Sequence, residues 1–223
     1  MNIRAMYFSG TGTTKKVTAA IADQLAKALA AENPPGKEIL GEAAGSEKSP
    51  MGSPGDENDP GEKKSGELPQ RKHGFETVQA PDAAPGKPVA AETENWHRAT
   101  DIDFTPPEAR QEHYRFTPDD LIVFGVPVIA GRVPNVLLKF LDTIQGGNAL
   151  VVPVVLYGNR NFDDALIELR NILQDHGFHA IAAAAFIGEH SFSRILGAGR
   201  PDSSDMELSR DFARKLAGKI RRH

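Results

Sequence analysis

The chain contains no cysteine, and that absence excludes several kinds of chemistry. Without thiols, its 223 residues form no disulfide, offer no thiolate nucleophile and ligate no iron–sulfur cluster through cysteine. No apolar run approaches the roughly 20 residues that a transmembrane helix needs, so we expect no membrane partner. A signal-peptide pattern is also missing before the first strand-like run. We therefore expect a cytoplasmic protein.

A strong charge of either sign is missing as well. The 26 basic and 30 acidic residues leave a net charge of −4. This balance is too mild to indicate nucleic acid or an anionic membrane surface as a partner. The seven histidines are scattered without the spacing of metal ligands, so no metal site is predicted.

The middle of the chain, residues 33–97, is poor in apolar side chains. It holds nine prolines and nine glycines among 65 residues, but only six Leu, Ile, Val or Phe. Such a segment buries too little apolar area to offset its chain entropy, so we expect a low-complexity, disordered insertion. It is either a tolerated loop expansion or, with twelve acidic and seven basic residues, an electrostatic tether for a partner. Trp96-His97-Arg98 at its end could pack back onto the domain.

The remaining residues, 1–32 and 98–223, alternate between strand and helix patterns and predict one domain. The expected strands cover residues 3–8, 99–105, 121–126, 149–157 and 179–187. The expected helices cover residues 13–31, 134–144, 162–176 and 203–220. This alternation predicts an α/β fold, a parallel sheet with helices on both faces. Five strands fit a doubly wound sheet of order 2-1-3-4-5.

A loop of small residues joins the first strand directly to the first helix. Backbone N–H groups at a helix start attract anions, and glycine lets the backbone approach a phosphate closely. The loop lacks both G-x-x-x-x-G-K-[ST] and G-x-G-x-x-G. Its own pattern is [ST]-x-T-G-x-T. The predicted phosphate loop comprises Ser9, Gly10, Thr11, Gly12, Thr13 and Thr14.

This pattern resembles the loop with which flavodoxins hold the monophosphate of FMN. Two further segments follow predicted central strands and look like the two flavin-ring loops of that family. The resemblance covers about 1–32 and 98–220, and implies a flavodoxin-like fold with bound FMN. It is nearest to flavodoxin domains fused to a ferredoxin-type domain. The expected ring-loop residues are Pro127, Val128, Ile129, Ala130, Gly131 and Arg132, then Tyr157, Gly158, Asn159, Arg160, Asn161 and Phe162.

The resemblance also implies roles for single residues. Phe162 stands where many flavodoxins place a ring-stacking Tyr, so it is either a flavin contact or a core residue. Asn159 stands where many carry Asp. Arg132 and Arg160 place cations on loops that are acidic in many flavodoxins, which predicts a less negative flavin potential. The plainer alternative is that both arginines form surface ion pairs.

The segment 188–201 follows the last predicted strand and so begins at the same edge of the sheet. Glu189, His190 and Ser191 are adjacent, and adjacent side chains diverge, which argues against a hydrolytic triad. We expect this segment to pack on the third loop or to dock a partner. No catalytic residue is assigned.

Three functions remain open. The first is an electron-transfer protein that exchanges electrons through FMN with a separate redox protein, iron–sulfur or flavin containing. The second is an FMN-dependent NAD(P)H or quinone oxidoreductase. The third is a non-redox module that binds a partner. The sequence does not decide the oligomeric state.

Overall fold

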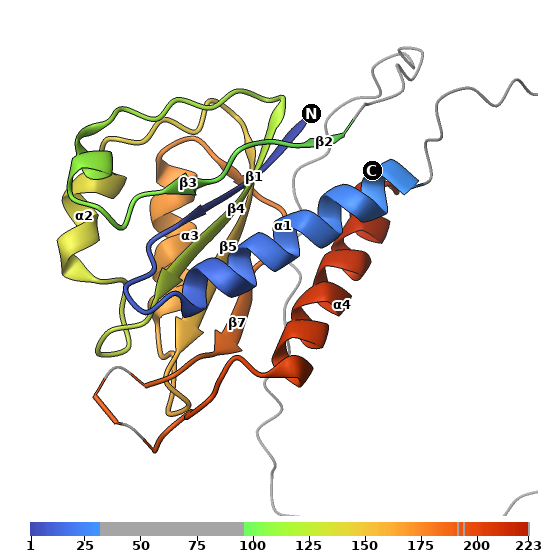
Figure 1. Ribbon diagram of the computed structural model, residues 1–223. Helices are drawn as coiled ribbons and strands as arrows, with labels where there is room; N and C mark the ends of the chain where they lie inside the picture. The colour runs from blue at the N-terminus through green and yellow to red at the C-terminus, as the bar shows by residue number, and fades with distance from the viewer. Residues whose placement is uncertain (32–95, 191, 194, 223) are drawn as a thin grey trace, which may run out of the picture. The chain divides into compact units, whose positions relative to one another are not determined.

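The computed structural model describes residues 1–31, 96–190, 192–193 and 195–222 (Figure 1). The predicted disordered insertion falls almost wholly outside these residues, so that hypothesis is not tested. Trp96 and His97 are the exceptions. Trp96 belongs to the packed domain. Its side chain is only 8% exposed and packs in the hydrophobic core, so the described domain resumes two residues before the predicted boundary at 98.

A parallel sheet forms the centre of the domain. Its order is β2-β1-β4-β5-β6, with β3 also pairing β1 and β7 also pairing β5. The predicted doubly wound order 2-1-3-4-5 is therefore confirmed, but each outer position holds two short strands in place of one. The strands are β1 (Asn2–Tyr7), β2 (His97–Arg98), β3 (Ile102–Asp103), β4 (Asp120–Pro127), β5 (Leu150–Tyr157), β6 (His179–Ala180) and β7 (Ala184–Ile187).

The strand expected at residues 99–105 is divided because a side chain interrupts its pairing with β1. Arg4 and Ala5 of β1 face the three residues 99–101, so the edge carries one extra residue. The backbone N–H of Ala5 donates to the carboxylate of Asp101 at 3.3 Å. A side chain thus accepts where a strand carbonyl would, and the edge bulges there.

The opposite edge is divided in the same way. Val152 and Pro153 of β5 face the three residues 181–183. Pro153 has no N–H to donate, which weakens the ladder at this point. The carbonyl of Ile181 instead accepts a hydrogen bond from the Lys219 ammonium at 2.7 Å.

Helices cover both faces of the sheet. On one face α1 and α4 lie side by side, and on the other lie α2 and α3 (Figure 1). Side chains of β1 alternate accordingly, with Ile3 and Ala5 in one core and Met6 in the other. The helices are α1 (Thr13–Ala31), α2 (Asn135–Leu141), α3 (Ala165–Asp175) and α4 (Ser203–Ile220), with an unexpected 3-10 turn, η1 (Glu108–Gln111).

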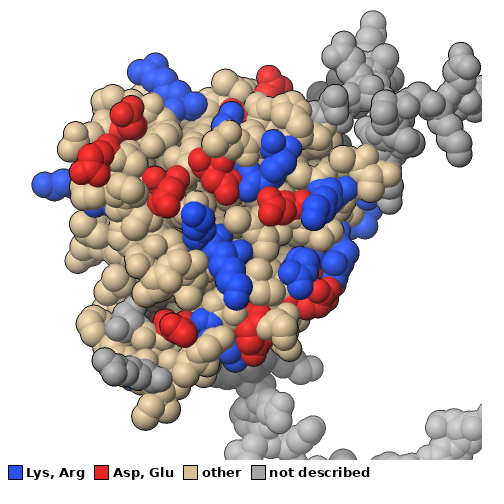
Figure 2. All heavy atoms as spheres, in the orientation of Figure 1, with Lys and Arg blue, Asp and Glu red and all other residues tan. Residues whose placement is uncertain are grey.

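Figure 2 shows basic and acidic side chains interspersed over the face that carries α1 and α4. On α4, Arg210 and Arg214 pair with Glu207 and Asp211. This face therefore presents no patch of a single sign. Among the described residues, no helix is long and apolar enough to cross a membrane.

Candidate functional site

The predicted phosphate loop lies between β1 and α1, at the carboxyl edge of the sheet. The hydroxyl of Ser9 accepts a hydrogen bond from the Lys15 N–H at 3.0 Å and so caps the first turn of α1. Four other backbone N–H groups of the loop donate to no described residue, those of Gly10, Thr11, Thr13 and Thr14. Four free donors at the start of a 19-residue helix form a site suited to an anion.

Gly12 sets the shape of this loop. Its φ of +84° lies in the left-handed region, which other residues adopt only with strain. Its N–H reaches the Ser9 carbonyl at 3.4 Å, and its own carbonyl accepts from the Lys16 N–H at 3.1 Å. The tight turn thus occupies the N–H of Gly12 within the loop and leaves the other four N–H groups without a described partner.

The second predicted loop, after β4, closes in a two-residue turn. The backbone groups of Ile129 and Arg132 exchange two hydrogen bonds of 3.1 Å. Ala130 and Gly131 between them both have positive φ, +52° and +75°, which defines a type I′ turn. The space above Gly131 is closed, because a Cβ there would lie 2.4 Å from a carboxylate oxygen of Asp163.

That contact joins the second loop to the third, which follows β5. The side-chain amide of Asn161 donates to the Asp163 carboxylate at 2.6 Å, and the Asp163 N–H donates back to the Asn161 oxygen at 3.2 Å. Asn159 and Asp163 both have positive φ, a conformation that short polar side chains tolerate. The two loops therefore meet in defined conformations.

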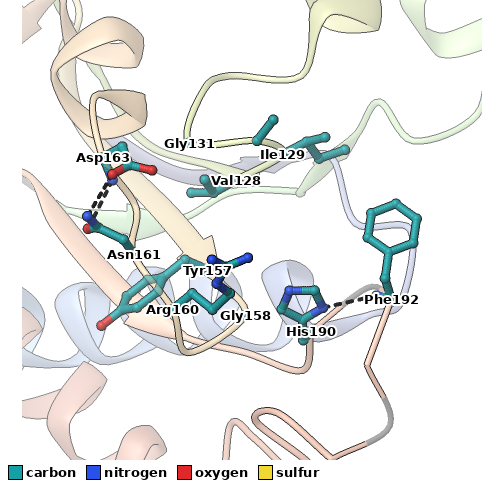
Figure 3. A pocket seen from close by; sticks show the side chains of 11 residues that line it. Val128, Ile129, Gly131, Tyr157, Gly158, Arg160, Asn161, Asp163, His190 and Phe192 are labelled. Atoms are coloured by element: carbon teal, nitrogen blue, oxygen red, sulfur yellow. Dashed lines mark hydrogen bonds between the residues drawn. The ribbon is translucent and has the colours of Figure 1, made fainter.

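A cleft of about 400 Å³ lies between these loops. Figure 3 shows it bounded by Val128 and Ile129 on one side, and by Tyr157, Gly158 and His190 on the other. Its volume falls within the range of small-molecule sites, about 300–1,000 Å³. The complete lining is Val128, Ile129, Ala130, Gly131, Tyr157, Gly158, Arg160, Asn161, Asp163, His190 and Phe192.

The cleft thus gathers most of the two predicted ring loops, but no residue of the phosphate loop. The segment after β7 connects the two regions. A Cβ on Gly188 would lie 3.5 Å from the Thr13 hydroxyl and 3.5 Å from a methyl of Leu156. The phosphate loop and the cleft therefore lie next to each other at one edge of the sheet.

Arg132 turns out of the cleft. Its guanidinium makes a two-point contact with Glu168 of α3, at 2.7 and 3.0 Å, and the Val133 N–H adds a third hydrogen bond to that carboxylate at 2.8 Å. The hydrogen bond from Arg132 lowers the pKa of the Glu168 carboxyl, despite its partial burial. Arg132 therefore matches the plainer alternative, a surface ion pair.

Phe162 also departs from its expected place. Its ring packs on Tyr157 with centroids 5.4 Å apart and lies against the core beneath α3. The aromatic side chains that line the cleft are Tyr157 and Phe192. The stacking role predicted for Phe162 does not fit this cleft, and its core alternative does.

Three cleft residues lie outside the predicted ring loops: Asp163, His190 and Phe192. Asp163 follows the third loop directly. Extending the predicted third loop by one residue beyond Phe162 would have included Asp163. His190 and Phe192 belong to the segment 188–201, whose packing on the third loop was expected. Its start follows β7, which lies beside β5 as the predicted strand order requires, but that order does not show that His190 and Phe192 line the cleft.

No group of three or more His, Asp or Glu side chains among the described residues is placed to hold a metal ion. No protein-family model matches this chain, and no curated protein matches it either.

Solved structures similar to the chain include two flavodoxins and a flavodiiron core. A flavodoxin from the domain Archaea has 10% identity over 99% of both chains and a TM-score of 0.48. The flavodoxin of Streptococcus pneumonia TIGR4 has 10% identity over 98% of this chain and 99% of its own, with a TM-score of 0.46. The Flv1 flavodiiron core from Synechocystis sp. PCC6803 has 13% identity and a TM-score of 0.46, over all of this chain and 36% of that one.

The fold is assigned from the chain's own topology. A parallel sheet in the order 2-1-3-4-5 with helices on both faces is a flavodoxin-like arrangement. In such sheets, ligands bind outside the carboxyl ends of the strands, near the point where the strand order reverses. The phosphate loop after β1 and the cleft beside β4 and β5 lie at that edge.

Proposed function

We propose that this chain binds FMN and transfers electrons through it. The observation that carries the proposal is the pairing of two sites at one sheet edge: four free N–H groups at the start of α1 and a cleft of about 400 Å³ beside them. The first suits a phosphate dianion, and the second suits a planar ring system. FMN carries both groups in one molecule.

The chain's own residues would bind and orient the cofactor. The free N–H groups of the loop would hold the phosphate without any basic side chain, and they belong to Gly10, Thr11, Thr13 and Thr14. The type I′ turn at Ile129–Arg132 and the loop from Tyr157 would flank the ring. FMN would supply the electron chemistry, while the protein sets binding, orientation and electrostatics.

We further propose that the redox partner lies outside these 223 residues and holds an iron–sulfur cluster or a flavin. The chain has no cysteine with which to ligate a cluster. Electrons that enter the proposed cofactor must therefore leave to a separate centre. Apolar side chains lie exposed on the loops around the cleft, and Ile129 and Phe192 would be available to contact such a partner.

The first experiment is to purify the chain, record its visible spectrum after reconstitution with FMN, and titrate it with dithionite without oxygen. A yellow protein that is reduced in two one-electron steps supports an electron carrier. Rapid direct bleaching by NADH or NADPH favours the oxidoreductase alternative. A protein that stays colourless contradicts FMN binding and leaves the partner-binding module.

A substitution at Gly10 tests the phosphate loop itself. Gly10 has no positive φ, and a Cβ there meets nothing within 4 Å, so a side chain fits without strain. In Gly10→Asp a carboxylate would stand where the phosphate binds. Gly10→Asn is the matched neutral control. We expect FMN to bind the Asp variant roughly tenfold or more weakly than the Asn variant, because like charges repel.

The same titrations with riboflavin provide the second control, because riboflavin lacks the phosphate. Riboflavin should bind the Asp and Asn variants equally. If FMN also binds both variants equally, the loop does not hold the phosphate and the proposed binding mode is wrong.

A further inference from the structure

His190 lies at the start of the segment after β7, with its imidazole on the wall of the cleft (Figure 3). Two backbone hydrogen bonds fix the position of His190 on this wall. The Gly188 N–H donates to the Tyr157 carbonyl at 2.9 Å, which continues the pairing of β7 with β5. The His190 N–H donates to the Leu196 carbonyl at 3.2 Å, which closes the loop behind it.

The ring is held in one orientation by its own loop. Nδ1 accepts hydrogen bonds from the backbone N–H groups of Phe192 and Ser193, at 3.1 and 3.2 Å. A nitrogen that accepts two such bonds carries no proton. In the neutral ring the proton therefore resides on Nε2.

Gly158 makes room for this ring. A Cβ at residue 158 would lie 2.7 to 2.8 Å from the Cα, Cβ and Cδ2 atoms of His190. Any other residue there would push the imidazole away from the third loop. The absence of a side chain at 158 is thus what allows His190 to reach the cleft.

Nε2 donates to no described residue, so the ring presents an unused N–H donor on the cleft wall. The charged side chains that share this cleft are Arg160 and Asp163. The Asp163 carboxylate accepts from Asn161, on the loop opposite.

We infer that His190 is a direct contact of the cofactor, with its Nε2–H donating a hydrogen bond to the ring bound in this cleft. The inference rests on the proposed function. A donor strengthens its bond when the acceptor gains negative charge, so this contact favours the reduced, anionic ring over the oxidised one. His190 thereby raises the reduction potential of the bound cofactor.

Two substitutions separate the roles of the two ring nitrogens. In His190→Asn the side-chain oxygen replaces the Nδ1 acceptor and keeps the loop, but the donor at the Nε2 position is lost. His190→Gln does the reverse, because its amide nitrogen reaches the Nε2 position while the acceptor for the loop is lost. Both variants are reconstituted with FMN, and their midpoint potentials are compared with that of the wild-type chain.

We expect His190→Asn to lose about tenfold in its preference for the reduced over the oxidised cofactor, equal to about 59 mV for a one-electron couple. Oxidised FMN should bind the Asn variant and the wild-type chain with similar affinity, and His190→Gln should retain most of the potential. If the Asn variant keeps the wild-type potential and the Gln variant loses it, the ring only supports its loop and the inference is overturned.

Nitrogen-15 NMR of the histidine rings tests the structural premise without any cofactor. A neutral ring protonated on Nε2 supports the inference, and one protonated on Nδ1 overturns it. A wild-type chain that binds no FMN removes the proposed function and this inference together. A wild-type chain that binds FMN, with an unchanged potential in His190→Asn, removes the inference alone.

Discussion

Arg160 lines the cleft and forms no ion pair with any residue that the structure describes. Its guanidinium is therefore not held by a paired carboxylate, and it should stabilise negative charge on a reduced ring nearby. We expect Arg160→Gln to lower the flavin potential by an energy of about 1 kcal/mol, or roughly 40 mV for a one-electron couple. Potentiometry at low ionic strength measures this, and added salt should reduce the difference.

Arg132→Gln is the matched control, since it removes the same charge from the neighbouring loop. Glu168 already neutralises the Arg132 guanidinium at 2.7 Å. The potential should therefore shift much less than in Arg160→Gln. Equal shifts in the two variants would show that their long-range charge matters and that the geometry of the cleft does not.

In these loops, the sequence predicts which residues lie near the cleft but not which way their side chains point. Most of the residues predicted for the two ring loops line the cleft after β4 and β5, and their role in binding a cofactor stays a prediction. The direction of each side chain was not accessible, because it depends on how the folded loops pack against their neighbours. Arg132 is turned aside by Glu168, 36 positions away, and Phe162 by Tyr157 and the core beneath α3.

At the scale of elements, the start of α4 depends on one buried carboxylate. Asp205 is only 4% exposed and pairs with Arg200, while Asp202 and Asp205 form a reciprocal cap. The hydrogen bond from Arg200 lowers the pKa of the Asp205 carboxyl. A lowered folded pKa stabilises the fold at neutral pH, and this contribution disappears as the pH falls below the ordinary carboxyl range, about pH 4.

We therefore expect Asp205→Asn to lower the Tm at pH 7 by an amount on the order of a few degrees. The deficit should shrink only as the pH falls below about 4 and through the lowered pKa of the folded protein, because the folded wild-type carboxylate is then protonated too. Asp211→Asn removes an acid of the same helix from an exposed pair with Arg214, and should change the Tm far less at either pH. Thermal unfolding of the wild-type chain and the two variants across this pH range measures these differences in Tm. A Tm deficit of Asp205→Asn that stays constant with pH would contradict the proposed role of the Asp205 carboxylate.

Element boundaries followed the sequence where a pattern is local. The apolar strand expected at 121–126 and the helix expected at 13–31 are observed as β4 (Asp120–Pro127) and α1 (Thr13–Ala31). The divided edges were not predictable. The break beside β1 depends on a contact between distant segments, Asp101 with Ala5, which no local pattern encodes. At the break beside β5, Pro153 is a local signal of a weakened ladder, but it does not show where the partner strand resumes.

At the scale of the whole molecule, the segment 36–94 contributes none of the residues described at the proposed site. Every residue of the phosphate loop and of the cleft lies within 9–14 or 128–192. A chain in which about eight Gly and Ser residues replace 36–94 should therefore bind FMN with unchanged affinity. Its free energy of unfolding should rise by about 2 kcal/mol, because closing a shorter loop costs less entropy.

A second deletion that extends to residue 96 also removes Trp96 and serves as a comparison. Trp96 is 8% exposed and packs in the core under α1 and α4, so its loss should cost about 3 kcal/mol or more. Urea unfolding and FMN titration of both shortened chains are compared with the full chain. If the insertion is a neutral loop expansion, the chain shortened to residue 94 should be at least as stable as the full chain. The chain shortened to residue 96 should be less stable, because it has lost Trp96. If the first deletion already loses flavin, the insertion itself contributes to the site, and the tether hypothesis becomes the better one.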